Sequence, residues 1–253
     1  MEGKIDNTQK VVYVAELDQD IDDIIAAEYL YRLGVLNGVV LDPPPKEEIG
    51  VKRLNILKSK GIPVSETIPE GTEYIFIGGA LTAVAKYIRN HTGVKALVMN
   101  GGYVGCNIVP FKDQLDKFKN KECVRTFNFN MDINATDTVL RSTPEQIQEI
   151  ILVGKNVCHS NKNTKLGIWK YGLPREILDE YHSKDEKKQH DMLACREGLV
   201  LTNMIEGPAY CEYKDVYPVT EDGLNGNMTH WGSTVLKKNT PYRVVKSAIR
   251  FKI

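Results

Sequence analysis

The chain has 253 residues, 42% apolar and 26% charged, and its 33 basic and 33 acidic residues cancel, so we expect neither a nucleic-acid-coating protein nor one drawn to membranes by charge. No apolar run approaches the roughly 18 residues of a membrane-spanning helix, and residues 1–4 lack the basic start and apolar core of a signal peptide. These features predict a cytoplasmic, globular protein whose partners are small molecules.

Apolar segments alternate with helical patterns through the first 100 residues. The segments are residues 11–17, 35–41, 74–77 and 95–99, and helical spacing follows at 21–33, 46–60 and 81–88. Gly34 and Gly61 stand where glycine commonly ends a helix. Because strands that alternate with helices are joined by crossovers, we expect an open, mostly parallel, doubly wound (Rossmann-like) α/β sheet flanked by helices.

The second half of the chain is less regular. Residues 110–124 are rich in Lys and Asp and predict a surface excursion. We then expect strands at 125–131, 149–157, 210–219 and 243–253, helices at 135–140, 173–181 and 189–205, and a loop at 223–229. Five scattered cysteines without a CxxC pair predict reduced thiols. No repeat or low-complexity linker is present, so residues 1–253 are expected to form a single domain.

The end of the first strand is unusually acidic. Five acids fall within eight residues: Glu16, Asp18, Asp20, Asp22 and Asp23. In open α/β sheets ligands bind at the carboxyl ends of strands, and like charges this close need a cation or hydrogen-bond donors to offset them. Oxygen ligands suit Ca²⁺ or Mg²⁺ better than zinc, so the segment predicts a divalent metal site. The simpler alternative is that these acids only complement the dipole of the following helix.

The segment Asp18-Gln19-Asp20-Ile21-Asp22-Asp23 resembles the aspartate signature of the inosine-uridine type, Ca-dependent nucleoside hydrolases. Other segments that are similar to that family follow in its order. They are residues 78–82 (Gly-Gly-Ala-Leu-Thr), 99–102 (Met-Asn-Gly-Gly), 105–107 (Gly-Cys-Asn), 127–132 (Phe-Asn-Phe-Asn-Met-Asp), 156–159 (Asn-Val-Cys-His) and 190–191 (His-Asp). The chain thus resembles a short, divergent member, with matches from about residue 11 to 201.

The resemblance implies hydrolysis of the N-glycosidic bond of a nucleoside or nucleoside 5′-phosphate, which releases free base and ribose or ribose phosphate. In that family Ca²⁺ chelates the ribose 2′ and 3′ hydroxyls, and a water on the metal attacks the anomeric carbon. The implied metal ligands are Asp18, Asp23, Asp191 and the carbonyl of Gly78. Asp18 would also be the general base. Family members commonly form homo-oligomers.

The remaining roles concern the substrate. His190 matches the residue that protonates the departing base, although a lone histidine beside a helix start is more often an ordinary side chain. The implied sugar contacts are Asp22, Asn100, Asn107 and Asn128.

Several positions depart from the family pattern. Glu16 replaces an aspartate, and Asp42 and the prolines after it replace a strand-end asparagine. Thr126 stands where the family has a glutamate that binds the outer sugar hydroxyls, and Arg125 precedes it. A carboxylate at this position would repel a phosphate, so its absence motivates the hypothesis that the substrate carries a 5′ phosphate. The alternative is sequence drift in a surface loop.

Two rival functions fit the same residues. Asp18-x-Asp20 after an apolar strand also fits a haloacid-dehalogenase-type phosphatase, with Asp18 as nucleophile and Asp20 as acid. A Ca-dependent module that binds ribose or a nucleotide without turnover is the non-catalytic alternative.

Overall fold

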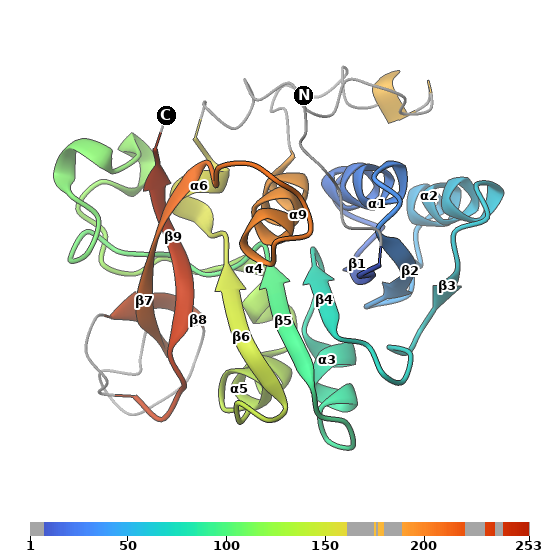
Figure 1. Ribbon diagram of the computed structural model, residues 1–253. Coiled ribbons are helices and arrows are strands. Elements are labelled where there is room, and N and C mark those ends of the chain that lie inside the picture. The colour runs from blue at the N-terminus through green and yellow to red at the C-terminus, as the bar shows by residue number, and fades with distance from the viewer. Residues whose placement is uncertain are drawn as a thin grey trace.

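The computed structural model describes residues 8–160, 175, 177–179, 189–220, 231–235 and 240–252. Its strands are β1 (Val11–Ala15), β2 (Leu36–Leu41), β3 (Val64–Ser65), β4 (Tyr74–Ile77), β5 (Val94–Met99), β6 (Ile147–Leu152), β7 (Cys211–Thr220), β8 (Trp231–Val235) and β9 (Val245–Phe251). They form one sheet in the order β3-β2-β1-β4-β5-β6-β9-β7-β8 (Figure 1). Neighbouring strands from β3 to β9 are parallel, and β7 is antiparallel to β9 and β8. The expected α/β class with an open, mostly parallel sheet is confirmed.

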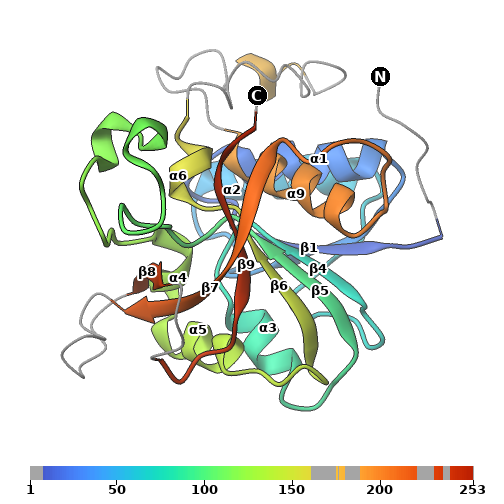
Figure 2. The ribbon, with the colours of Figure 1, turned by 60° about the vertical axis from the view of Figure 1, so that its left-hand side comes forward.

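Helices cover both faces of this sheet (Figures 1 and 2). They are α1 (Asp22–Arg32), α2 (Glu48–Ser59), α3 (Thr82–Tyr87), α4 (Phe127–Met131), α5 (Ile133–Leu140), α6 (Lys155–Cys158) and α9 (His190–Leu201), with 3₁₀ turns η1 (Phe111–Asp113) and η2 (Asp116–Phe118). Within the described residues, no helix combines the length and apolarity needed to cross a membrane.

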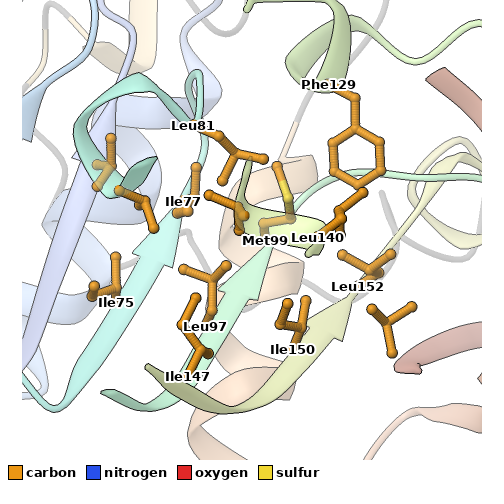
Figure 3. Close-up of a cluster of buried hydrophobic side chains, with 14 of the residues drawn as sticks. Ile75, Ile77, Leu81, Leu97, Met99, Phe129, Leu140, Ile147, Ile150 and Leu152 are labelled. Atoms are coloured by element: carbon orange, nitrogen blue, oxygen red, sulfur yellow. The ribbon is translucent and has the colours of Figure 1, made fainter. Parts of the chain in front are cut away.

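Successive side chains of β1 enter two different cores because strand residues alternate between faces. Tyr13 packs in the core that includes α1 and α9, whereas Val12 and Val14 pack in the core that includes α3 and α5. Figure 3 shows the second core, where apolar side chains of β4, β5 and β6 meet Phe129 and Leu140. Burial on both faces explains why these strands read as almost continuous apolar runs.

The order of strands reverses beside β1. From β1 the chain passes through α1 to β2 and through α2 to β3, then returns to β4 on the other side of β1 and continues outward to β5 and β6 (Figure 1). The carboxyl ends of β1 and β4 therefore face a topological switch point, which is where open α/β sheets form ligand-binding crevices.

Two expected elements differ from the structure. Residues 125–131, expected as a strand, contain the short helix α4, because the asparagine side chains of this segment bond to main-chain carbonyls in place of a strand ladder. The strand expected at 149–157 ends at Leu152, and α6 follows Gly154. Strands β3 and β8 were not predicted. Most of the expected helix 173–181 and the loop 223–229 lie outside the described residues.

Candidate metal centre

Three buried carboxylates converge at the switch point. Asp22 and Asp23 lie in the first turn of α1 and Asp191 in the first turn of α9, and these helices lie side by side (Figure 1). Each residue offers an oxygen, and these oxygens all lie within 4.8 Å of one another. The three residues are only 4%, 4% and 2% exposed. The structure thus brings together acids that are more than 160 residues apart in the sequence.

A few donors hold these carboxylates in place. The Tyr13 hydroxyl donates to Oδ1 of Asp23 at 3.0 Å, and the backbone N–H of Glu16 donates to the same oxygen at 3.1 Å. Asn100 donates through Nδ2 to Oδ1 of Asp191 at 2.7 Å. Both aspartates also lie near helix N-termini, whose partial positive charge favours an anion.

The neighbouring charges nevertheless oppose ionisation of the cluster. Burial raises the pKa of Asp23 well above its usual range, and the nearby Asp22 raises it further. Burial likewise raises the pKa of Asp191, with Asp22 and Asp23 adding to the effect. The same cause and the nearby Asp191 raise the pKa of the Tyr13 hydroxyl. Ionised carboxylates here therefore need a positive charge to offset them.

Gly78, at the end of β4, leaves room beside the carboxylates. A Cβ atom at this position would lie 2.2 Å from the Tyr13 hydroxyl, 2.4 Å from Oδ1 of Asp23 and 2.7 Å from Oδ2 of Asp191. Only glycine fits without moving these groups. Because the donor set consists of closely spaced carboxylate oxygens, the cluster can hold a metal ion, and its chemistry suits a hard divalent cation.

Asn100 and Asn128, which were predicted to bind the sugar, form hydrogen bonds within the protein. Asn128 donates through Nδ2 to the carbonyls of Gly78 and Asn100, both at 2.7 Å. Asn100 orients Asp191, and its own Oδ1 lies 3.5 Å from the thiol of Cys158 as acceptor. Both asparagines line the cavity, but their amides stabilise the strand ends and the cluster.

A cavity of about 340 Å³ opens over the cluster. Its carboxylates come from the β1–α1 segment and α9, and residues of α4 and α6 and the glycines after β5 form much of the rest of its lining. The volume falls within the range of small-molecule sites. The lining residues are Glu16, Gln19, Asp20, Asp22, Asp23, Gly78, Asn100, Gly101, Gly102, Thr126, Phe127, Asn128, Lys155, His159, His190 and Asp191.

Asp18, predicted as metal ligand and general base, is not brought to this cluster. Its carboxylate accepts the backbone N–H groups of Lys46 and Glu47 at 2.8 and 3.1 Å, just before α2. It lies against Gly50, where a Cβ would be 2.0 Å from Oδ1 of Asp18. The correction has a local cause: amides near a helix start lack helical partners, and a carboxylate satisfies them.

The same helix holds the rest of the acidic segment. Arg53 of α2, 2% exposed, donates through Nη1 to the carbonyls of Leu17 and Asp20 at 2.7 and 2.9 Å. The Glu16 carboxylate accepts the N–H groups of Asp18 and Gln19 at 2.8 and 3.2 Å. With the loop fixed in this way, Asp20 lines the cavity and Asp18 does not.

Of the two remaining predicted residues, one lines the cavity and the other does not. His190 lines the cavity, with Nδ1 4.0 Å from Oδ2 of Asp22. Asn107 is exposed and lies outside the described lining, so the structure does not place it with the others.

Sequence reasoning gave Lys155 and His159 no individual role, and it gave Asp20 one only in the acidic segment and as the acid of the phosphatase alternative, but all three line the cavity. The rings of His159 and His190 lie 4.7 Å apart, and Nδ1 of His159 is 2.6 Å from Nζ of Lys117. The available signal was the similarity of residues 156–159 to a strand-end segment of the nucleoside hydrolases, since ligand-binding residues gather at strand ends.

No protein-family model matches the chain. Over 182 residues it is 26% identical to an uncharacterized protein of Aquifex aeolicus (strain VF5), and the alignment covers 67% of this chain and 58% of that protein. The chain therefore spans less than two thirds of the length of the relative that it matches.

Proposed function

We propose that the chain is a Ca²⁺-dependent hydrolase that cleaves the N-glycosidic bond of a nucleoside or nucleoside 5′-phosphate and releases the free base. The observation that carries the proposal is the convergence of Asp22, Asp23 and Asp191 under a cavity at the switch point. The order of the segments that resemble the nucleoside hydrolases supports the same reaction.

In this proposal Asp22, Asp23 and Asp191 hold the cation, and the Gly78 carbonyl lies on the same strand end. When bound, Ca²⁺ supplies the positive charge that binds vicinal sugar hydroxyls and favours deprotonation of water. The surrounding donors, Tyr13 and Asn100, keep two of the carboxylates oriented toward one point.

The cavity offers a different general base from the one that the resemblance implies. Of the acids that line it outside the cluster, Glu16 uses both oxygens to accept backbone N–H groups. Asp20 also lines the cavity, and it lies near enough to Asp191 that its charge adds to the effect of burial in raising the pKa of that carboxyl. We assign proton removal from water to Asp20. His190 lies beside Asp22 and is positioned to donate a proton to the departing base.

The experiment is release of free base from a panel of nucleosides and nucleoside 5′-monophosphates, read by chromatography with and without chelator. We expect release that needs the cation and is lost in Asp191→Asn. Absence of base release from the whole panel in the presence of Ca²⁺ would refute the proposal.

Two matched variants test the base. Asp20→Asn and Asp18→Asn each remove one negative charge from the same loop, but only Asp20 lines the cavity. We expect Asp20→Asn to lower kcat by about 10²–10⁴-fold, and Asp18→Asn to retain activity at reduced stability. The reverse result would restore Asp18 as the base.

The phosphatase alternative is less well supported. It needs the Asp18 carboxylate to attack a phosphoryl group, yet that carboxylate faces the amides before α2.

A further inference from the structure

The lining of the cavity also carries basic groups, which come from elements other than the acidic segment. We call this set the basic corner: Lys155 and His159, which line the cavity, and Lys117, which contacts His159. Lys155 begins α6 and His159 follows it, with the His159 N–H donating to the Lys155 carbonyl, so the two side chains project from the same side of one helical turn. Lys117 comes from η2, far away in the sequence.

Contacts on several sides fix the His159 ring. Nζ of Lys117 lies 2.6 Å from its Nδ1. An ammonium group only donates hydrogen bonds, so Nδ1 accepts and Nε2 carries the hydrogen. The Phe118 ring packs edge-on at 5.6 Å and the His190 ring lies at 4.7 Å. His159 is thus held as a hydrogen-bond donor through Nε2.

A chain of contacts links the carboxylates to the basic corner. From Oδ2 of Asp22, the first step is 4.0 Å to His190, the second is 4.7 Å between the rings of His190 and His159, and the third is 2.6 Å to Lys117. Among the described lining residues, every carboxylate belongs to residues 16–23 or is Asp191. A ligand that fills the cavity therefore contacts both the carboxylate cluster and the ammonium and imidazole N–H groups of the basic corner.

We infer that the basic corner binds a phosphate monoester, so that the substrate is a nucleoside 5′-monophosphate; this rests on the proposed function. Two ammonium groups and an oriented N–H donor match the charge and the acceptors of a phosphate. Arg125, to which the sequence pointed, is exposed and does not line the cavity. The residues that carry the phosphate specificity are instead Lys155, His159 and Lys117.

The test is calorimetric binding of ribose, ribose 5-phosphate and inorganic phosphate to the full chain in the presence of Ca²⁺. The variants are Lys155→Gln and His159→Gln, and the matched control is Arg125→Gln, which removes a nearby positive charge outside the cavity lining. We expect ribose 5-phosphate to bind at least about tenfold more tightly than ribose. Lys155→Gln and His159→Gln should each remove most of this preference, and Arg125→Gln should keep it.

The ribose arm separates this inference from the proposed function. Equal affinities for ribose and ribose 5-phosphate would overturn the inference and leave the function standing. Phosphate binding that depends on Lys155 and His159, without any binding of ribose, would support the phosphate site and overturn the function. The preference for ribose 5-phosphate could instead survive in Lys155→Gln and His159→Gln and be lost in Asp23→Asn. That result would place the phosphate on the cation and overturn the inference. Absence of binding by all three compounds would overturn it as well. Circular dichroism confirms that each variant is folded.

Discussion

Replacement of Gly78 by alanine tests whether the carboxylate cluster is the metal centre. The new Cβ would approach the Tyr13 hydroxyl and oxygens of Asp23 and Asp191 at 2.2 to 2.7 Å, which is so close that atoms must shift. All three groups are buried and packed, so relief requires them to move apart. Overpacking of this kind costs about 1–3 kcal/mol. Because the atoms that must move are ligand oxygens, we expect cation binding to suffer more than folding does.

Gly50→Ala is the matched control. A Cβ at position 50 would meet Oδ1 of Asp18 at 2.0 Å and Cβ of Pro45 at 2.8 Å, so the steric conflict is similar but lies away from the cluster. Both variants should melt at lower temperature, by about 2–4 °C per kcal/mol in a chain of this size. The assay is a thermal melt followed over a titration with Ca²⁺.

The effect of Ca²⁺ on the melting temperature distinguishes the two variants. A cation at 100 times its dissociation constant stabilises the folded state by about 2.7 kcal/mol. We expect this rise in melting temperature in the wild type and in Gly50→Ala, and its loss in Gly78→Ala. A Gly78→Ala protein that shows the full wild-type rise would refute the reasoning, because the ligands would then lie elsewhere.

Three further predictions follow from the buried charges. Asp191→Asn removes a costly buried charge, so the melting temperature of the metal-free variant should be higher than that of the wild type, and the Ca²⁺-induced rise should disappear. A lower metal-free melting temperature would contradict the raised pKa of Asp191. Burial and neighbouring carboxylates raise the folded-state pKa of Asp23 and Asp191 above the unfolded value. The contribution of these two residues to metal-free stability is therefore fully present below the unfolded pKa, and it is lost as pH rises through the folded pKa. The Ca²⁺-induced rise in melting temperature should therefore be larger at pH 8 than at pH 5, and an unchanged rise would argue against these ligands. Glu197, fully buried, accepts from Arg196, the Tyr213 hydroxyl and two backbone N–H groups, so Glu197→Ala should cost about 3–5 kcal/mol in urea unfolding, whereas Tyr213→Phe should cost about 0.5–1.5 kcal/mol.

The parallel sheet could be predicted because its strands are buried on both faces and end in glycine or polar residues. The location of the acidic segment followed from the same pattern. Its detailed roles did not, because the direction of the Asp18 side chain depends on amides before α2 that only the folded chain brings near. The Asp42 carboxylate likewise accepts a backbone N–H near a helix start, that of Ala83 in α3. Local spacing cannot distinguish a ligand from a helix cap.

The basic corner was beyond sequence reasoning for a related reason. His159 and Lys117 are separated by 42 positions and meet only because η2 folds back beside α6. The helix α4 was missed because Phe-Asn-Phe-Asn alternates as a strand does, while the Asn128 amide bridges the ends of β4 and β5 in three dimensions.

The distance in sequence between the aspartates has a consequence for how the fold is held together. Asp22 and Asp23 lie near the start of the chain, whereas their partner Asp191 belongs to α9, which packs against α1 and against β4 and β5. A cation shared by both helices would act as a reversible cross-link of the folded chain, which holds together two elements more than 160 residues apart in the sequence. Calcium should then slow hydrogen exchange at the amides of α9 more than at those of α3, which reports how firmly α9 is held.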